Sequence, residues 1–310
     1  MKHIVLDTDP GIDDALALLI ALNSPNLRIE AITSVVGNVS HAQAHSNVKR
    51  LLEFVGVEDV PVCGGAERPL FREYAGAEAV HGSSGLGGAR LPEPRLRSSE
   101  ETAVEMILEK ADSLGKALTL LAIGPLTNIA AALLVDPGLA EKVSELVIMG
   151  GAFGVTPYGW GNVTPVAEFN IWHDPEAAAI VFHSGIPITA IGLDTTTHPQ
   201  YRLTKTMFEE IKQAGSRTSR LVVGMVENLV EKHDGMSLHD PQALAYVLDP
   251  SRFETVDVRV DVETQGVLTR GMTVVERRPN QLKGGQPIHV VTSLDEEWFL
   301  ELVRESLTGG

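Results

Sequence analysis

Residues 4–14 of the chain read IVLDTDPGIDD, and an Ala- and Leu-rich stretch follows as far as Leu22. The apolar run at 4–6 is typical of a buried strand, Pro10 and Gly11 favour a tight turn, and residues 14–22 carry a helical pattern. This order predicts the first unit of a fold in which strands alternate with helices.

The same order recurs along the chain. Apolar, β-branched runs predict strands at 29–36, 118–123, 146–149 and 188–193, and helical stretches continue through Leu52 and over 126–134. Parallel strands need crossover connections, and near-continuous apolar strands fit a sheet that is covered on both faces. The sequence therefore predicts an α/β fold with a mostly parallel open sheet covered by helices on both faces.

The character of the sequence changes from about residue 254. Runs at 255–262 and 273–275 predict strands of a more exposed, partly antiparallel addition, and residues 298–307 predict a closing helix. We find no internal repeat, low-complexity tract or linker in the sequence. We expect one domain over residues 1–310, with a small C-terminal extension.

The composition limits the classes of function. The 310 residues include 25 Lys and Arg against 41 Asp and Glu, which sets a formal charge of −16. An acidic chain without a basic stripe argues against nucleic acid and anionic membranes as partners. The single cysteine, Cys63, excludes internal disulfides and Cys-based zinc sites. The first residues are too polar for a signal peptide, and no apolar stretch approaches about 20 residues, so we expect a cytoplasmic protein.

Polar residues that directly follow the expected strands are candidates for a binding site. In open α/β sheets, ligands bind beyond the carboxyl ends of the strands. By this rule, the candidate ligand-binding residues are Asp7, Asp9, Asp13, Asp14, Asn38, Asn128, Asp194 and Asp240.

Four of these carboxylates lie within eight residues, from Asp7 to Asp14. Asp7 and Asp9 share one face of the strand, whereas Asp13 and Asp14 fall where a helix begins and its N–H groups favour anions. Helix capping and solvation account for one or two of them. Crowded carboxylates repel one another, so the others are protonated, exposed or bound to a cation, and an oxygen-only set suits Ca²⁺ or Mg²⁺.

Three motifs compete for this stretch. An EF-hand loop does not fit, because Leu18 stands at the twelfth position from Asp7 and Pro10 breaks the loop. A phosphoryl-transfer aspartate of the haloacid dehalogenase type also begins with Asp-x-Asp, but Pro10-Gly11 replaces its Gly-Thr continuation. Residues 7–15, DTDPGIDDA, more closely resemble the N-terminal motif of the inosine-uridine-preferring nucleoside hydrolase family.

The resemblance continues in order along the chain. The further motifs that match are Val36-Gly37-Asn38, His81-Gly82 with Gly85-Leu86, Ile123 to Asn128, Met149-Gly150-Gly151, Asn162 to Pro165, Ala167 to Asn170, and His239-Asp240. Each motif is short, but the ordered set is specific and extends from residue 7 to residue 240. The resemblance implies an enzyme that hydrolyses the N-glycosidic bond of ribonucleosides to free nucleobase and ribose.

The resemblance also implies a bound Ca²⁺. Asp9 would bind the ion and act as general base toward the water that the ion holds. Asp14, Asp240 and the main-chain carbonyl of Ile123 would complete the ligands, and Asp7 would support the site through hydrogen bonds. The negative charge of this cluster suits a transition state that resembles an oxocarbenium ion.

Further residues are assigned to the substrate by the same resemblance. His81 and His239 are the nucleobase candidates, and His239 is expected to protonate the departing base. Taken alone, each of these residues also has a structural explanation. It could form a turn, occupy a buried strand position or belong to the core. The residues assigned to the ribose are Asp13, Asn38, Met149, Asn162, Glu168 and Asn170.

One segment departs from the family pattern. Several relatives carry tyrosines before the His-Asp motif, whereas residues 227–235 here read ENLVEKHDG. His233 is the candidate to replace them, so the choice between purine and pyrimidine stays open. Asp240 itself precedes Pro241, a pattern that also fits a helix N-cap. Trp160 and Tyr158 are able to stack on a base but are left outside the expected site.

Two other functions stay open at this point. A Mg²⁺-dependent phosphatase would use Asp7 and Asp9, and a non-catalytic protein would bind nucleosides with Ca²⁺ but release no base. The intact Asp9 favours catalysis, because binding alone needs no general base. The local acidity favours an uncharged small-molecule nucleoside over a nucleotide. The family resemblance also implies a homodimer or homotetramer.

Overall fold

The computed structural model describes residues 1–278 and 285–309, and it contains a central sheet of nine strands in the order β10-β9-β11-β6-β5-β4-β1-β2-β3. The strands from β11 to β3 are parallel to their neighbours, whereas β9 pairs antiparallel with both β10 and β11. The strands are β1 (Lys2–Thr8), β2 (Leu27–Ser34), β3 (Val62–Gly64), β4 (Leu118–Ala122), β5 (Glu145–Met149), β6 (Ile188–Ile191), β9 (Phe253–Val262), β10 (Thr273–Val275) and β11 (Gln286–Leu294).

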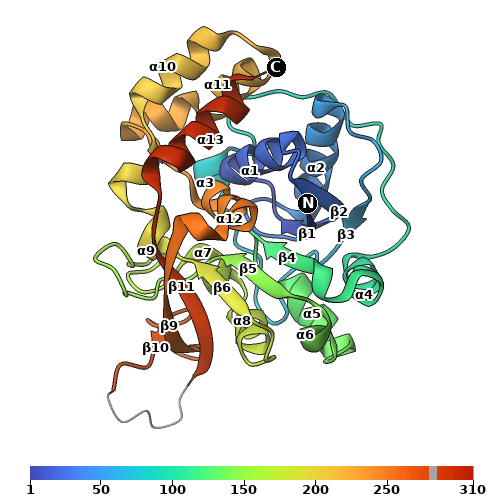
Figure 1. Ribbon diagram of the computed structural model, residues 1–310, viewed down its shortest axis with the longest axis vertical. Helices are drawn as coiled ribbons and strands as arrows, with labels where there is room; N and C mark the ends of the chain where they lie inside the picture. The colour runs from blue at the N-terminus through green and yellow to red at the C-terminus, as the bar shows by residue number, and fades with distance from the viewer. Residues whose placement is uncertain (279–284, 310) are drawn as a thin grey trace.

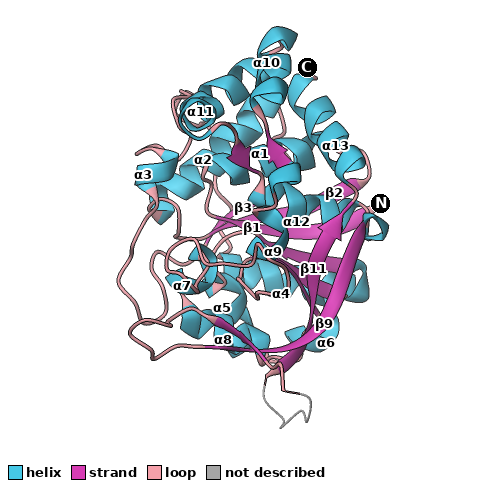
Figure 2. Cartoon of the chain, turned by 90° about the vertical axis from the view of Figure 1, so that its left-hand side faces the viewer, coloured by secondary structure: helices cyan, strands magenta, loops and turns pink. Residues whose placement is uncertain are grey.

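Helices surround this sheet (Figures 1 and 2). A separate two-stranded sheet is formed by β7 (Arg202–Leu203) and β8 (Met236–Ser237). The helices are α1 (Ile12–Asn23), α2 (His41–Val55), α3 (Glu78–His81), α4 (Ala103–Leu114), α5 (Thr127–Val135), α6 (Leu139–Lys142), α7 (Phe169–His173), α8 (Pro175–Phe182), α9 (Leu193–Thr196), α10 (Lys205–Ala214), α11 (Arg217–His233), α12 (His239–Leu248) and α13 (Glu296–Thr308).

The alternation of side chains along β1 explains why both faces of the sheet are covered. Ile4 and Leu6 join a core with buried residues of α1, α2 and α10 to α13. Val5 points to the opposite face and joins a second core with residues of α4, α5, α6 and α8. The predicted mostly parallel α/β sheet with helices on both faces is confirmed.

The strand order reverses between β1 and β4. From β1 the chain proceeds to β2 and β3 on one side, and from β4 it proceeds to β5 and β6 on the other. Such a reversal opens a crevice at the carboxyl ends of the two central strands. Asp7 lies at the carboxyl end of β1 and Asp9 directly follows it, while Ile123 directly follows β4.

The C-terminal addition contains the predicted elements and one further strand. The expected strands at 255–262 and 273–275 and the closing helix are present as β9, β10 and α13. The strand β11 was not predicted; it pairs parallel with β6 and so attaches this addition to the main sheet. The short edge strand β3 was not predicted either. Within the described residues, no helix is long and apolar enough to cross a membrane.

Candidate active site

The turn between β1 and α1 places Asp13 and Asp14 in the first turn of α1, as predicted. Asp14 is fully buried and receives hydrogen bonds from Thr8 Oγ1 (2.7 Å), the Gly11 backbone N–H (3.0 Å) and Asn38 Nδ2 (2.9 Å). Burial and the negative charge of Asp13 nevertheless raise the pKa of Asp14. The donors fix this carboxylate in place, but they do not fully offset its removal from water.

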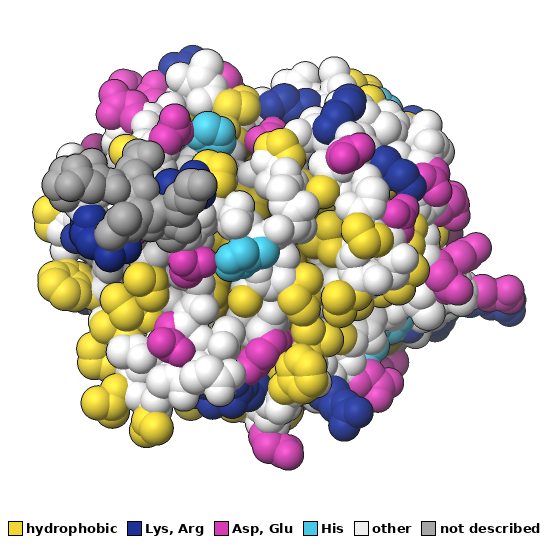
Figure 3. Space-filling view, turned by 90° about the horizontal axis from the view of Figure 1, so that it is seen from below, with side chains coloured by type: hydrophobic (Ala, Val, Ile, Leu, Met, Phe, Trp, Pro, Cys, Tyr) yellow, Lys and Arg dark blue, Asp and Glu magenta, His cyan; other side chains and the backbone are white. Residues whose placement is uncertain are grey.

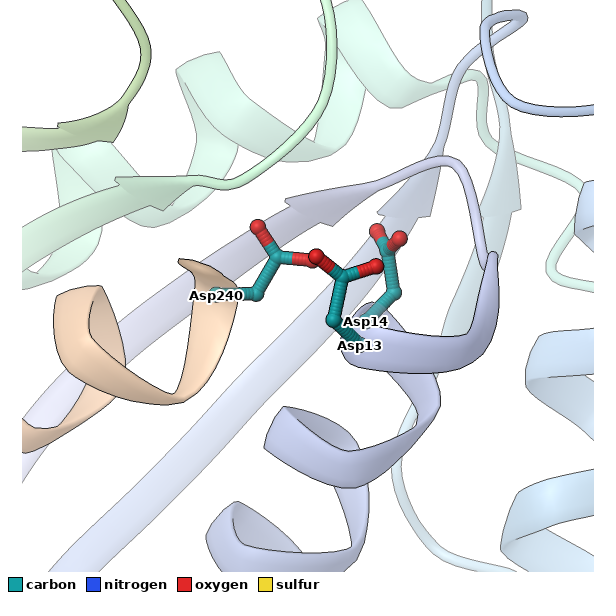
Figure 4. Close-up of side chains that lie close together, drawn as sticks. All are labelled: Asp13, Asp14 and Asp240. Carbon is teal, nitrogen blue, oxygen red and sulfur yellow. The ribbon is translucent and has the colours of Figure 1, made fainter. Parts of the chain in front are cut away.

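Asp240 joins this pair from the other side. Ligand oxygens of Asp13, Asp14 and Asp240 all lie within 4.8 Å of one another. The carboxylates project from the starts of α1 and α12 and turn toward one another (Figure 4). Burial, followed by the charges of Asp13 and Asp14, raises the pKa of Asp240 well above its ordinary value. A divalent cation would relieve this repulsion, so the set suits a metal ion.

Asp9 is buried beside the same cluster. Its Oδ2 accepts a hydrogen bond from the backbone N–H of Asn38 at 2.6 Å, while its Oδ1 has no partner among the described residues. Burial, together with the charge of Asp14, raises the pKa of Asp9 well above its ordinary value. An orphaned, buried carboxylate oxygen is costly unless a cation, a water or a proton satisfies it. A cation or water bound next to Asp9 would satisfy this free oxygen.

Asp7 lies behind Asp9 and away from the cavity. Its Oδ1 accepts hydrogen bonds from Asn128 Nδ2 (2.7 Å) and Thr33 Oγ1 (2.5 Å). Burial raises the pKa of Asp7 to about 7, and the two hydrogen bonds oppose this rise. Asn128 also accepts from the Ala66 backbone N–H at 2.8 Å, so it connects Asp7 to the segment after β3. The supporting role expected for Asp7 agrees with these contacts.

The surroundings of Asp240 differ from two patterns that its sequence suggested. It does not follow a strand of the main sheet, because the strand before it, β8, belongs to the separate two-stranded sheet. It is also not an N-cap, because α12 begins at His239 and the cap position is Leu238, whose side chain makes no cap hydrogen bond. The carboxylate is therefore not engaged in capping and faces Asp13 and Asp14 instead.

Asn170, in the first turn of α7, links the carboxyl ends of the neighbouring strands β4 and β5. Asn170 Nδ2 donates to the carbonyl oxygens of Ile123 and Met149, at 3.0 Å in each case. Glu168 caps α7 through the N–H groups of Asn170 (2.9 Å) and Ile171 (3.1 Å), and it accepts from Gly151 N–H at 3.0 Å. Burial raises the pKa of Glu168, and these three donors oppose the rise.

Three histidines, His81, His233 and His239, line the same cavity as Glu168. His81 Nδ1 accepts a hydrogen bond from the Ile12 backbone N–H at 3.0 Å. His239 Nδ1 lies 2.8 Å from Thr196 Oγ1, and burial lowers the pKa of His239 while Asp13 opposes this. His233 ends α11, is exposed and lines the cavity as well.

A cavity of about 670 Å³ connects these groups. It opens directly onto the carboxylate cluster, and its walls contain all the residues expected to touch the ribose and the base. Asp9 and Asp14 lie beneath the surface and do not line it. The lining residues assigned from the sequence are Asp13, Asn38, His81, Ile123, Met149, Asn162, Glu168, Asn170, His239 and Asp240.

Sequence reasoning missed several side chains of this cavity. Phe169 and Trp172 line it from α7, Leu229 from α11, and Arg202 from β7. Only Phe169 carried a signal, since it stands inside a matched motif between Glu168 and Asn170. Tyr158 and Trp160 do not line the cavity, and Trp160 is 72% exposed.

Asp194, which was weighed as a candidate because it follows β6, has a structural role. Its carboxylate accepts hydrogen bonds from the backbone N–H groups of Phe153 (2.8 Å), Val155 (2.7 Å) and Thr156 (3.2 Å). It therefore holds the loop that follows β5, and this loop leads on to Asn162 in the cavity wall.

The fold and site define an α/β protein with a buried, oxygen-only carboxylate cluster beside a cavity at the switch point of the sheet. Over residues 4–301 the sequence matches the inosine-uridine preferring nucleoside hydrolase family. The chain belongs to this family.

Comparisons with individual proteins agree with this assignment. The chain is 42% identical over 312 residues to the pyrimidine-specific ribonucleoside hydrolase RihA of Escherichia coli O9:H4 (strain HS), covering 98% of this chain and 97% of that protein. It superimposes on a plant nucleoside hydrolase, the PpNRh1 enzyme, with a TM-score of 0.89 and 34% identity, covering 100% and 99% of the two chains. A purine-preferring ribonucleoside hydrolase from Gardnerella vaginalis has the same TM-score at 31% identity, covering 99% and 98%.

Proposed function

We propose that this enzyme hydrolyses the N-glycosidic bond of ribonucleosides and releases free nucleobase and ribose. The observation that carries the proposal is the unpartnered Oδ1 of Asp9 beside the cluster of Asp13, Asp14 and Asp240, next to a cavity of about 670 Å³. Membership of the family supports the class of reaction. The curated relative at 42% identity is named as pyrimidine-specific, so we propose pyrimidine ribonucleosides as the preferred substrates.

The proposed cofactor is Ca²⁺, held by Asp9, Asp14, Asp240 and the main-chain carbonyl of Ile123. Carboxylate and carbonyl oxygens are the ligands that this ion prefers. The Ile123 carbonyl accepts one hydrogen bond from Asn170 and retains a second lone pair. When bound, such an ion orients a water molecule and makes it more acidic.

In this proposal, separate side chains activate the water, hold the ribose and bind the departing base. Asp9 takes a proton from the attacking water, and the negative charge around it favours the cationic sugar of the transition state. Asp13, Asn38, Met149, Asn162, Glu168 and Asn170 hold the ribose. His239 and His81 serve the departing base. Because burial lowers the pKa of His239, its protonated form depends on the nearby carboxylate of Asp13.

The charges of the cavity favour an uncharged nucleoside. Among the described residues that line it, Asp13, Glu168 and Asp240 are acidic and Arg202 is the one Lys or Arg. Without a bound cation these walls carry a net negative charge, which repels a phosphate ester, and a divalent cation offsets only part of the acidity that includes the buried Asp9 and Asp14. This observation disfavours the phosphatase alternative.

The decisive experiment measures free base and reducing sugar released from uridine, cytidine, inosine, adenosine and uridine 5′-monophosphate. The protein is first treated with a chelator and is then given Ca²⁺, Mg²⁺ or no metal. We expect base release from the pyrimidine nucleosides that the chelator abolishes and Ca²⁺ restores. Phosphate release from the nucleotide without base release from uridine would establish the phosphatase instead. Uridine binding without turnover would establish a binding protein.

We further propose that the chain forms one domain, assembles as a homodimer or homotetramer and works in the cytoplasm without nucleic acid or membrane partners. On the face shown in Figure 3, Lys and Arg side chains are interspersed with acidic and hydrophobic ones. A nucleic-acid surface would instead gather positive charge along one stripe. Light scattering coupled to gel filtration measures the oligomeric state.

A further inference from the structure

His81 lines the cavity from a different part of the chain than the carboxylate cluster. Its Nδ1 lies 3.0 Å from the backbone nitrogen of Ile12, at the start of α1. A backbone N–H can only donate, so Nδ1 accepts and the proton of the neutral ring lies on Nε2. This contact therefore selects the ring nitrogen that is able to donate to a ligand in the cavity.

One buried amide connects the loop of His81 to the turn that carries the carboxylates. Asn47 lies on α2 and is 0% exposed. Its Nδ2 donates to the carbonyl of Ser84, three residues after His81, at 2.8 Å, and to the carbonyl of Pro10 at 3.2 Å. Its Oδ1 accepts from Gln43 Nε2 at 2.8 Å and from Arg50 Nη1 at 3.4 Å, and these two donors fix the orientation of the amide.

The close packing at Gly85 shows that the loop rests directly on this turn. Gly85 has a φ of +78°, and a Cβ at this position would lie 2.8 Å from the Pro10 carbonyl and 2.9 Å from Asn47 Nδ2. A larger residue would push the loop away from the turn. The amide of Asn47 and the bare backbone of Gly85 together set the distance between the two segments.

We propose that Asn47 is a positioning residue for His81. By joining the carbonyls of Pro10 and Ser84, it holds the loop so that His81 keeps Nδ1 on the Ile12 N–H and presents its Nε2 proton to the departing nucleobase. Asn47 touches neither the cavity nor the carboxylates, and it acts through His81. The proposal rests on the proposed function for the identity of the ligand, but the ring state of His81 is independent of it.

This role predicts a selective kinetic defect. Release of a pyrimidine base needs a proton or a hydrogen bond on the base, whereas 4-nitrophenolate leaves a riboside without protonation. Asn47→Ala should therefore lower kcat for uridine by about 10- to 100-fold. It should leave kcat for 4-nitrophenyl β-ribofuranoside within about twofold of the original value.

The test uses Asn47→Ala with two companions. Gln43→Ala removes one of the two hydrogen bonds to Asn47 Oδ1 and leaves the bond from Arg50 and both Nδ2 contacts. It is therefore the matched control and should leave both rates nearly unchanged. In the double variant Asn47→Ala/His81→Ala, uridine hydrolysis should be no slower than in His81→Ala alone. Equal losses on the two substrates, or additive losses in the double variant, would overturn the proposal.

A spectroscopic measurement separates this inference from the proposed function. In ¹⁵N-labelled protein, the ring of His81 should show an unprotonated Nδ1 and a protonated Nε2, and Asn47→Ala should shift it toward a mixture of tautomers. An unchanged tautomer in the variant contradicts the positioning role. If the protein releases no base from any nucleoside, the proposed function fails, and the tautomer still decides the role of Asn47.

Discussion

At the scale of single residues, Asp9 carries the most specific prediction. Asp9→Asn keeps the shape of the side chain but removes both the base and the negative charge next to Asp14. We expect kcat for uridine to fall by about 10²- to 10⁴-fold, the usual range for loss of a general base. Asp112→Asn, at an exposed carboxylate, is the control. Near-normal kcat in Asp9→Asn would remove this residue from the chemistry.

Gly37 tests how closely the backbone packs on the same carboxylate. A Cβ at Gly37 would lie 1.9 Å from Asp9 Oδ2, so Gly37→Ala must displace either Asp9 or the neighbouring Asn38. A displacement of about 1 Å is able to cost about 10²-fold in rate, and we expect a loss of this order. Gly64→Ala is the control, because its nearest contact, at 3.5 Å, is ordinary. Equal rates in the two variants would contradict the steric argument.

At the scale of elements, the loop after β5 depends on Asp194. Asp194→Asn replaces an acceptor oxygen with an amide nitrogen, which faces the backbone N–H groups of the loop. We expect the free energy of unfolding to fall by about 1–3 kcal/mol in urea titrations, because a buried donor loses its partner. Asp261→Asn, which breaks an exposed pair with His183, should change it by at most about 1 kcal/mol. A smaller change in Asp194→Asn than in this control would contradict the role.

The strands that were predicted correctly have one property in common. Continuous apolar strands such as β4 and β5 are buried on both faces, so their composition alone marks them. In contrast, β11 alternates exposed and buried residues and includes Pro287, which weakens the pattern of a strand. The edge strand β3 has only three residues. Neither of these strands is recognisable from its sequence alone.

At the scale of the whole molecule, a buried histidine makes stability depend on pH. His173 is 2% exposed, packs against Phe169 and Tyr74, and has no hydrogen-bond partner on either ring nitrogen among the described residues. Burial lowers its pKa from 6.5 to about 4. Between these values the unfolded chain binds a proton that the folded chain does not, so the stability contributed by neutral His173 is lost as pH falls through this window.

His173→Phe removes this contribution and keeps an aromatic ring in the same place. The free energy of unfolding of the original protein should decline relative to the variant between pH 6.5 and pH 4, by up to about 1.4 kcal/mol per pH unit. Urea titrations at a series of pH values measure the difference. Gln213→Ala, at an exposed side chain that does not titrate, is the control and should run parallel to the original protein. A parallel curve for His173→Phe would refute the assignment.

The chemistry of residues 7–14 was readable in the sequence because it is local. Four carboxylates on one strand–turn–helix unit stay close together whatever the remainder of the chain does. Spacing and charge therefore predicted a candidate cation site and the order of the first elements. Matched motifs then supplied the candidates from Asn38 to Asp240. They did not supply the contacts among them.

Those contacts depend on packing between distant segments. Asp240 meets Asp13 and Asp14 only because α12 packs across α1, and Asn170 reaches the carbonyl of Ile123 only because β4 and β5 are neighbours. Arg202 and Trp172 entered the cavity wall for the same reason, with no local pattern to mark them. Sequence spacing determines what neighbours on one element are able to do, whereas the free energy of burying two cores determines which elements meet.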